Sequence, residues 1–139
     1  MAQEYRASVP AVMEKIEELC NFVSDVARSA DLDDNLIHRC YLSVEEICTN
    51  IIEHGYGNHG EDEVIDVVCE RYPDRLLVTV FDDAHPPFDP LSCDDPDPMT
   101  PLWERTGGGW GVYFVKQYMD NVYYNYEHNR NQLTIEILL

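Results

Sequence analysis

A cluster of glycines ahead of a helix-forming run is the sequence feature that most limits how this chain can fold. Four of the seven glycines fall within residues 107–111, and an apolar run without further glycine or proline follows over 112–119. Small residues let a backbone approach an anion, and the first N–H groups and dipole of a helix then face that anion. The pattern indicates either a phosphate-binding start of a helix over about 109–119 or a flexible hinge.

Length and charge narrow the class of protein. The 139 residues suit one domain over 1–139, and the hydrophobic content of 45% favours a globular chain. The formal net charge of −18 opposes binding to the backbone of DNA or RNA. We therefore expect no direct nucleic-acid binding, and a basic protein partner or a cation that accompanies an anionic ligand.

Cysteine usage and hydropathy bear on the compartment. The five cysteines are widely spaced and include no C-x-x-C pair, so the sequence predicts neither a disulfide framework nor a zinc ribbon. The N-terminus lacks an apolar signal core, and no run approaches the ~20 apolar residues that span a bilayer. We therefore expect a cytoplasmic protein with no membrane partner.

Hydrophobic periodicity predicts strands and helices in a definite order. A strand is followed by two helices, a hairpin, a long loop, a helix and a final hairpin, which favours an α/β chain with helices on one face of a mixed, mostly antiparallel sheet. The expected bounds are strand 4–9, helices 10–29 and 34–56, strands 64–71 and 75–81, helix 109–119, and strands 121–127 and 132–138.

The second predicted helix carries a polar stripe beside its apolar one. Glu46 and Asn50 are four residues apart, so their side chains are neighbours on one helix face. They can be an ordinary solvated pair, or a general base beside a Mg²⁺ ligand. Asparagine is a poor residue for the middle of a helix, which gives the functional interpretation its support.

The second strand of the first hairpin ends at consecutive acidic residues. An aspartate just past a buried strand can accept a hydrogen bond from the amino group of a ligand, and a turn-forming aspartate is the alternative. A proline-rich, irregular segment follows over about 84–106. Loops of this length are uncommon in compact domains unless they have a function, so we expect a mobile lid.

Taken in order, three segments resemble bacterial anti-sigma factor serine kinases, in the ATP-binding superfamily of histidine kinases, gyrase B and Hsp90. Residues 46–56 are similar to the asparagine-containing helix box of that family, residues 83–90 to its first glycine box, and residues 107–111 to its second. The chain end over 119–134 also resembles family members, so the likeness covers nearly the whole chain. The resemblance implies a Bergerat-type ATP-binding fold, a two-layer α+β sandwich.

The resemblance also implies roles for individual residues. Glu46 would take the proton from a substrate serine, and Asn50 would bind the Mg²⁺ that bridges the phosphates of ATP. Asp83 would accept a hydrogen bond from the adenine amino group. His54 would lie near the phosphates, although a capping or packing role is equally open. The remaining nucleotide-binding residues that the resemblance implies are Arg105, Thr106, Gly107, Gly108, Gly109 and Gly111.

Two features depart from the family pattern. Where the family has Asp-x-Gly, this chain has Asp83-Ala84-His85. Either His85 replaces the glycine, or Ala84 does, with Asp82 as the adenine ligand and one residue inserted. The lid is also acidic, which is unfavourable beside a triphosphate unless the lid stays open or more metal binds. Its acidic residues are Asp89, Asp94, Asp95, Asp97 and Glu104.

The function that the resemblance implies is an ATP- and Mg²⁺-dependent protein serine kinase that acts in partner switching. Such a protein is an anti-sigma factor that binds a sigma factor, phosphorylates a serine of an anti-anti-sigma protein of the STAS type, and forms a homodimer. The altered glycine box keeps two alternatives open: a nucleotide-dependent module that sequesters its partner without useful kinase activity, and an interaction domain that binds no nucleotide.

Overall fold

The computed structural model describes residues 2–92, 97, 99 and 110–139. Within them the helices and strands follow the predicted order. In chain order they are β1 (Gln3–Pro10), the 3-10 turn η1 (Met13–Lys15), α1 (Ile16–Ser29), α2 (Asp34–Asn50), the π-helical turn η2 (Ile51–Gly55), β2 (Val64–Arg71), β3 (Arg75–Asp82), the 3-10 turn η3 (Pro90–Ser92), α3 (Trp110–Tyr118), β4 (Asn121–Glu127) and β5 (Arg130–Leu138).

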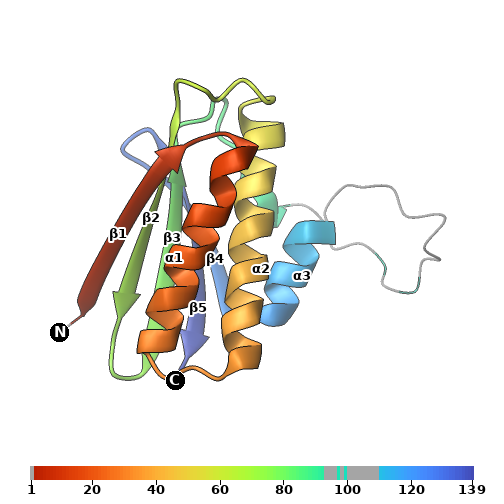
Figure 1. The fold of residues 1–139 in the computed structure, drawn as a ribbon. Helices are drawn as coiled ribbons and strands as arrows, with labels where there is room; N and C mark the ends of the chain where they lie inside the picture. The colour runs from red at the N-terminus through yellow and green to blue at the C-terminus, as the bar shows by residue number, and fades with distance from the viewer. Residues whose placement is uncertain (1, 93–96, 98, 100–109) are drawn as a thin grey trace.

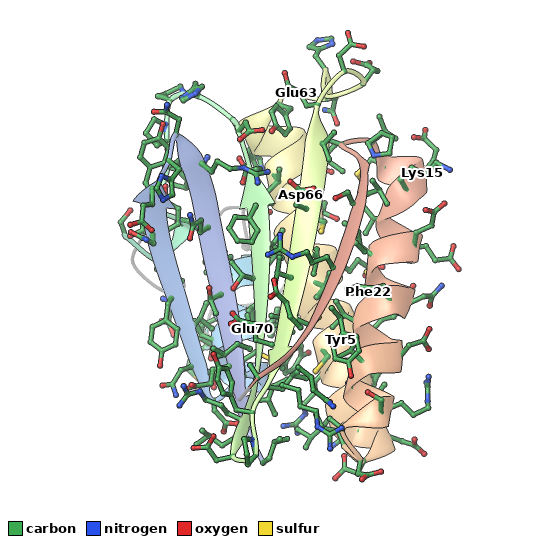
Figure 2. All side chains as sticks on the ribbon, turned by 90° about the vertical axis from the view of Figure 1, so that its left-hand side faces the viewer. Tyr5, Lys15, Phe22, Glu63, Asp66 and Glu70 are labelled. Carbon is green, nitrogen blue, oxygen red and sulfur yellow. The ribbon has the colours of Figure 1, made fainter. Side chains whose placement is uncertain are left out.

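The described strands form one sheet in the order β1-β2-β3-β5-β4. All four neighbouring pairs are antiparallel, so this sheet is antiparallel throughout and not mixed. The three helices lie on one face of it (Figure 1), and the other face, which carries Asp66 and Glu70, is turned to the viewer in Figure 2. The predicted two-layer α+β fold is confirmed.

The core lies between the sheet and the helices. In β5, Leu133, Ile135 and Ile137 are at most 8% exposed and alternate with residues that are less buried, as the predicted half-buried strand requires. Leu19 of α1 and Val44 of α2 are fully buried against this face. Helix α2 contacts both α1 and α3, so it is the central helix of the layer (Figure 1).

The starts of the first helix and of the last strand differ from the sequence expectation. Pro10 was expected to begin the first helix, but it ends β1 opposite Val64, and α1 starts only at Ile16. A proline is tolerated there because β1 is an edge strand. Strand β5 begins at Arg130 because the left-handed residues His128 and Asn129, with φ of 55° and 59°, make a two-residue hairpin turn.

Cysteine placement and hydropathy complete the description of the fold. Cys20, Cys40, Cys48 and Cys69 are free thiols in the core, and burial raises the pKa of Cys20, Cys40 and Cys69 to about 12. Cys93 lies outside the described residues. In the part of the chain that the structure describes, no helix has the length and apolar character to cross a membrane.

Candidate functional site

Helix α2 presents Glu46 and Asn50 on one face. The helix begins at an N-cap, where the Asp33 carboxylate accepts a hydrogen bond from the Leu36 N–H at 2.8 Å. It stays regular through Asn50, so the spacing of four residues between the two side chains is a true helical neighbour spacing. Both residues are half-buried.

The helix continues to Gly55, within one residue of the expected end, but its last turn is not a regular α-helix. After Asn50 the helix widens into the π-helical turn η2, in which the Tyr56 N–H donates to the Ile51 carbonyl at 2.9 Å. The wider turn changes the phase of the helix and carries the exposed His54. Such turns are rare overall, and those that occur are often found at functional sites.

The start of α3 lies directly against the Glu46 and Asn50 pair. A Cβ atom added to Gly111 would overlap the Glu46 carboxylate and would lie 3.8 Å from Asn50 Nδ2. The contact is with the end of the flexible Glu46 side chain, which would have to move if residue 111 carried a Cβ atom. The structure thus brings together three of the predicted site residues, one from the glycine cluster and two from α2.

The electrostatic setting of Glu46 suits a proton acceptor. Burial raises the pKa of its carboxyl group, and the nearby carboxylates of Glu45 and Glu53 raise it further. None of the ion pairs among the described residues includes Glu46. A carboxylate with a raised pKa is a better base than an ordinary surface glutamate.

The two aspartates at the end of β3 face opposite sides of the sheet. Asp82 is in phase with the buried residues of β3, is 6% exposed and faces the helix layer. The carboxylate of Asp83 instead accepts a hydrogen bond from Arg130 Nε at 2.9 Å. Arg130 Nη2 also donates to Asp66 Oδ2 at 2.6 Å, and Asp66 lies on the helix-free face (Figure 2). The structure therefore does not place Asp83 on the helix side with Glu46 and Asn50.

The Asp82 carboxylate is held by a polar residue that the sequence analysis missed. Its Oδ1 accepts from the Ala84 N–H and from Asn131 Nδ2, both at 2.9 Å. Asn131 is 7% exposed and in phase with Leu133 on the buried face of β5. A polar residue in phase with the buried positions of a strand was the available signal. Burial raises the pKa of Asp82, although the bonds from Ala84 and Asn131 oppose this shift.

The end of β3 is joined to the end of the helix that carries the predicted base. The Asp83 N–H donates to the Tyr56 hydroxyl oxygen at 2.8 Å. A Cβ atom on Gly55 would lie 3.1 Å from the Ala84 Cβ, so the last residue of η2 packs closely on the residue that follows the two aspartates. These contacts fix the buried aspartate relative to α2.

The donor set fits Mg²⁺ bound together with a phosphate ligand. The amide oxygen of Asn50 is a hard oxygen donor beside a carboxylate, which suits this cation. Among the described residues no group of three or more His, Cys, Asp or Glu side chains could hold a metal alone. Magnesium at phosphate sites takes few protein ligands and completes its shell with phosphate oxygens and water, so one or two protein oxygens suffice.

Five of the predicted nucleotide-binding residues lie outside the described residues and stay predictions. They are Arg105, Thr106, Gly107, Gly108 and Gly109.

Comparison with known proteins places this arrangement in a family. The serine-protein kinase RsbW of Bacillus pumilus is 30% identical over 118 residues, which are 82% of this chain and 73% of that protein. RsbW of Bacillus velezensis is 30% identical over 117 residues, which are 82% of this chain and 72% of that protein.

A solved structure supports the fold independently. The crystal structure of the RsbU and RsbW domains of Rv1364c from Mycobacterium tuberculosis covers 98% of this chain with a TM-score of 0.67. This chain spans 32% of the length of that one, and the identity of 13% means that the similarity shows the fold alone. Residues 9–137 match the histidine kinase-like ATPase domain, and the chain belongs to this family.

Proposed function

We propose that this chain is an ATP- and Mg²⁺-dependent protein serine kinase and an anti-sigma factor of a partner-switching system. The observation that carries the proposal is the contact of Gly111, at the start of α3, with the Glu46 and Asn50 pair on α2. It brings the proposed base, the proposed metal ligand and a glycine in the first turn of α3 to one place. Phosphoryl transfer requires positioning and charge stabilisation from these parts.

Each residue has a defined task in this proposal. The Glu46 carboxylate accepts the proton of the acceptor serine as the serine oxygen bonds to the γ-phosphorus and ADP leaves. The Asn50 amide oxygen holds Mg²⁺. The absence of a side chain at Gly111 lets the first N–H groups of α3 approach the phosphates. When bound, ATP supplies the phosphoryl group and Mg²⁺ neutralises its charge.

For the adenine contact we propose Asp82 in place of Asp83. The Asp82 carboxylate lies on the same side of the sheet as α2, whereas that of Asp83 is engaged by Arg130. This choice corresponds to the alternative in which Ala84 stands for the family glycine. His54, exposed on η2, stays a candidate for the phosphate side of the site.

The proposed partners follow from the family resemblance of the sequence and from the charge of the chain. The proposed targets are a sigma factor and an anti-anti-sigma protein of the STAS type, bound by a cytoplasmic homodimer whose protomer is the single domain 1–139 with its lid at about 84–106. The net charge of −18 fits a basic target surface. Association with that target should therefore weaken as the salt concentration rises.

The test combines nucleotide binding with phosphate transfer. A ligand that binds only the native state raises the unfolding midpoint, so Mg-ATP should raise the midpoint of the wild type but not that of Asn50→Ala. Glu46→Gln should keep the ATP-induced shift and lose transfer to the STAS protein by about 100-fold or more. Glu45→Gln, on the adjacent residue of the same helix, is the matched control and should lower transfer far less, because it removes only one of the charges that raise the pKa of Glu46. Normal transfer by Asn50→Ala would contradict the proposal.

The replacement of the first-box glycine by Ala84, which packs on Gly55, favours a second candidate. In this candidate the chain binds nucleotide and sequesters its partner without transfer. It predicts an ATP-induced shift in the wild type with no phosphate on any STAS protein.

A further inference from the structure

Three side chains at one end of the sheet form a continuous hydrogen-bonded row. The Tyr124 hydroxyl of β4 donates to Asn131 Oδ1 of β5 at 2.5 Å, and Asn131 Nδ2 donates to Asp82 Oδ1 of β3 at 2.9 Å. We call this set the Tyr124–Asn131–Asp82 row. It crosses three adjacent strands on the helix side of the sheet. It ends at Asp82, the residue proposed for the adenine contact.

The row fixes the orientation of the Asn131 side-chain amide. Its Nδ2 donates twice, to Asp82 Oδ1 and to the Ala84 carbonyl oxygen at 3.0 Å. If the amide turned over, its oxygen would face these two acceptors without a proton between them. The Tyr124 hydroxyl reinforces the observed orientation, because burial and nearby carboxylates raise its pKa and keep it a proton donor.

The same contacts make the two oxygens of the Asp82 carboxylate unequal. Among the described residues, both hydrogen bonds of this carboxylate go to Oδ1, from the Ala84 N–H and from Asn131. Oδ2 accepts no hydrogen bond from the described residues, so within this part of the chain it is the oxygen open to a ligand. A carboxylate whose one oxygen is anchored twice cannot rotate to present a different edge without losing both bonds.

We propose that Asn131 and Tyr124 are positioning residues of the nucleotide site, which hold Asp82 so that Oδ2 accepts the 6-amino group of adenine. They thereby set the preference for a 6-amino purine over a 6-oxo purine, whose C6 substituent is an acceptor. This inference rests on the proposed function, since it assumes that the site takes a purine nucleotide. It adds to that function the residues that make it selective.

The test compares Mg-ATP with Mg-ITP, which carries a 6-oxo purine. We expect Tyr124→Phe to lower the ratio of ATP affinity to ITP affinity about threefold to tenfold, because the Asn131 amide loses one of the three hydrogen bonds that hold its orientation. Asn131→Ala should lower the ratio at least as much. Tyr123→Phe and Asn121→Ala are matched controls on the same strand, whose side chains contact Glu136 on the other face, and they should leave the ratio unchanged.

A second measurement separates positioning from a merely structural role. The bond from Asn131 lowers the pKa of Asp82. In Asn131→Ala, ATP affinity should therefore fall at a higher pH on acidification than in the wild type. An unchanged pH profile together with an unchanged ATP-to-ITP ratio would overturn the positioning role.

The outcomes distinguish the two proposals. A wild type that gives no thermal shift with either nucleotide contradicts the proposed function itself. A wild type that responds to ATP, with the same selectivity in Tyr124→Phe as in Tyr123→Phe, overturns the positioning role alone. If Asn131→Ala fails to fold, Tyr124→Phe decides, because it removes one hydroxyl and keeps the ring.

Discussion

At the end of β3, neighbouring residues make different kinds of contact on the two faces of the sheet. On the helix side, Asp82 and Asn131 form a buried hydrogen-bonded pair, and no ion pair among the described residues includes Asp82. On the helix-free face, their sequence neighbours Asp83 and Arg130 form a partly exposed ion pair. Position in the motif therefore does not decide which aspartate can meet a ligand. The deciding factor is the face of the sheet on which the aspartate side chain lies.

The substitution that tests this contrast most strongly is Asp82→Asn. The asparagine oxygen can still accept from Ala84 and Asn131, but its NH₂ group replaces the accepting Oδ2 and meets the adenine amino group as donor against donor. We expect ATP affinity to fall about 100-fold by calorimetric titration. Asp83→Asn makes the same change of charge one residue later and should leave affinity within about threefold of wild type. Equal losses in the two variants would break the contrast.

Much of the fold could be predicted because the apolar spacing is clear. The stripe of α2 and the alternation of Leu133, Ile135 and Ile137 have a definite period, and the structure has a helix and a half-buried strand there. The boundary errors came from local backbone effects. Pro10 continues an edge strand, and two left-handed residues shorten the last turn.

The site could be predicted only in part, for a physical reason. Apart from Thr79, strand β3 is apolar on both faces from Leu76 to Phe81, so its sequence does not reveal which of the two following aspartates faces the helices. The partner of that aspartate depends on the register between β3 and β5, which are far apart in sequence. Asn131 was identifiable only once its phase with Leu133 was combined with that register.

The substitution Arg130→Met tests how much the ion pairs on the helix-free face contribute to stability. Arg130 is 29% exposed and pairs with Asp66 and Asp83, and its guanidinium lies 5.2 Å from the centre of the Phe81 ring. Methionine keeps some packing on Phe81 but leaves two carboxylates without a cation. We expect the free energy of unfolding in urea to fall by about 1–2 kcal/mol, with ATP affinity unchanged.

Arg28→Met supplies the control for this change. Arg28 pairs with Asp25 on the exposed surface of α1, and its loss should cost about 0–0.5 kcal/mol. If Arg130→Met weakened ATP binding as strongly as Asp82→Asn, the two faces would not be energetically separate.

The pH dependence of stability should have opposite signs on the two faces. Burial of Asp66 tends to raise its pKa, but bonds from Ser8 and Arg130 outweigh this and the pKa is lowered. The stability from Asp66 is therefore present above its unfolded pKa and is lost as the pH falls through its folded pKa. Burial raises the pKa of Asp82, so its carboxylate costs stability that grows as the pH rises above the unfolded value.

Urea denaturation from pH 7 to pH 3 can separate these two contributions. The stability gap between wild type and Arg130→Met should narrow on acidification. Asp82→Asn should be at least as stable as wild type at pH 7, and its advantage should shrink towards pH 3. A gap for Arg130→Met that stays constant over this range would mean that the ion pair with Asp66 contributes nothing to stability.

The smallest effect is expected for the stability of Asp83→Asn. Asp83 is 43% exposed, so solvent screens its bond to Arg130, and Arg130 keeps its shorter contact with Asp66. The change should lower the free energy of unfolding by about 0–1 kcal/mol, and less at high salt. In a double-mutant cycle with Arg130→Met, the coupling energy should be below the whole cost of Arg130→Met, because Asp66 carries the rest. A coupling energy equal to the whole cost of Arg130→Met would mean that Arg130 stabilises the fold through Asp83 at the end of β3 and not through Asp66 on β2. The ion pair on the helix-free face would then help to hold the neighbouring Asp82 in position.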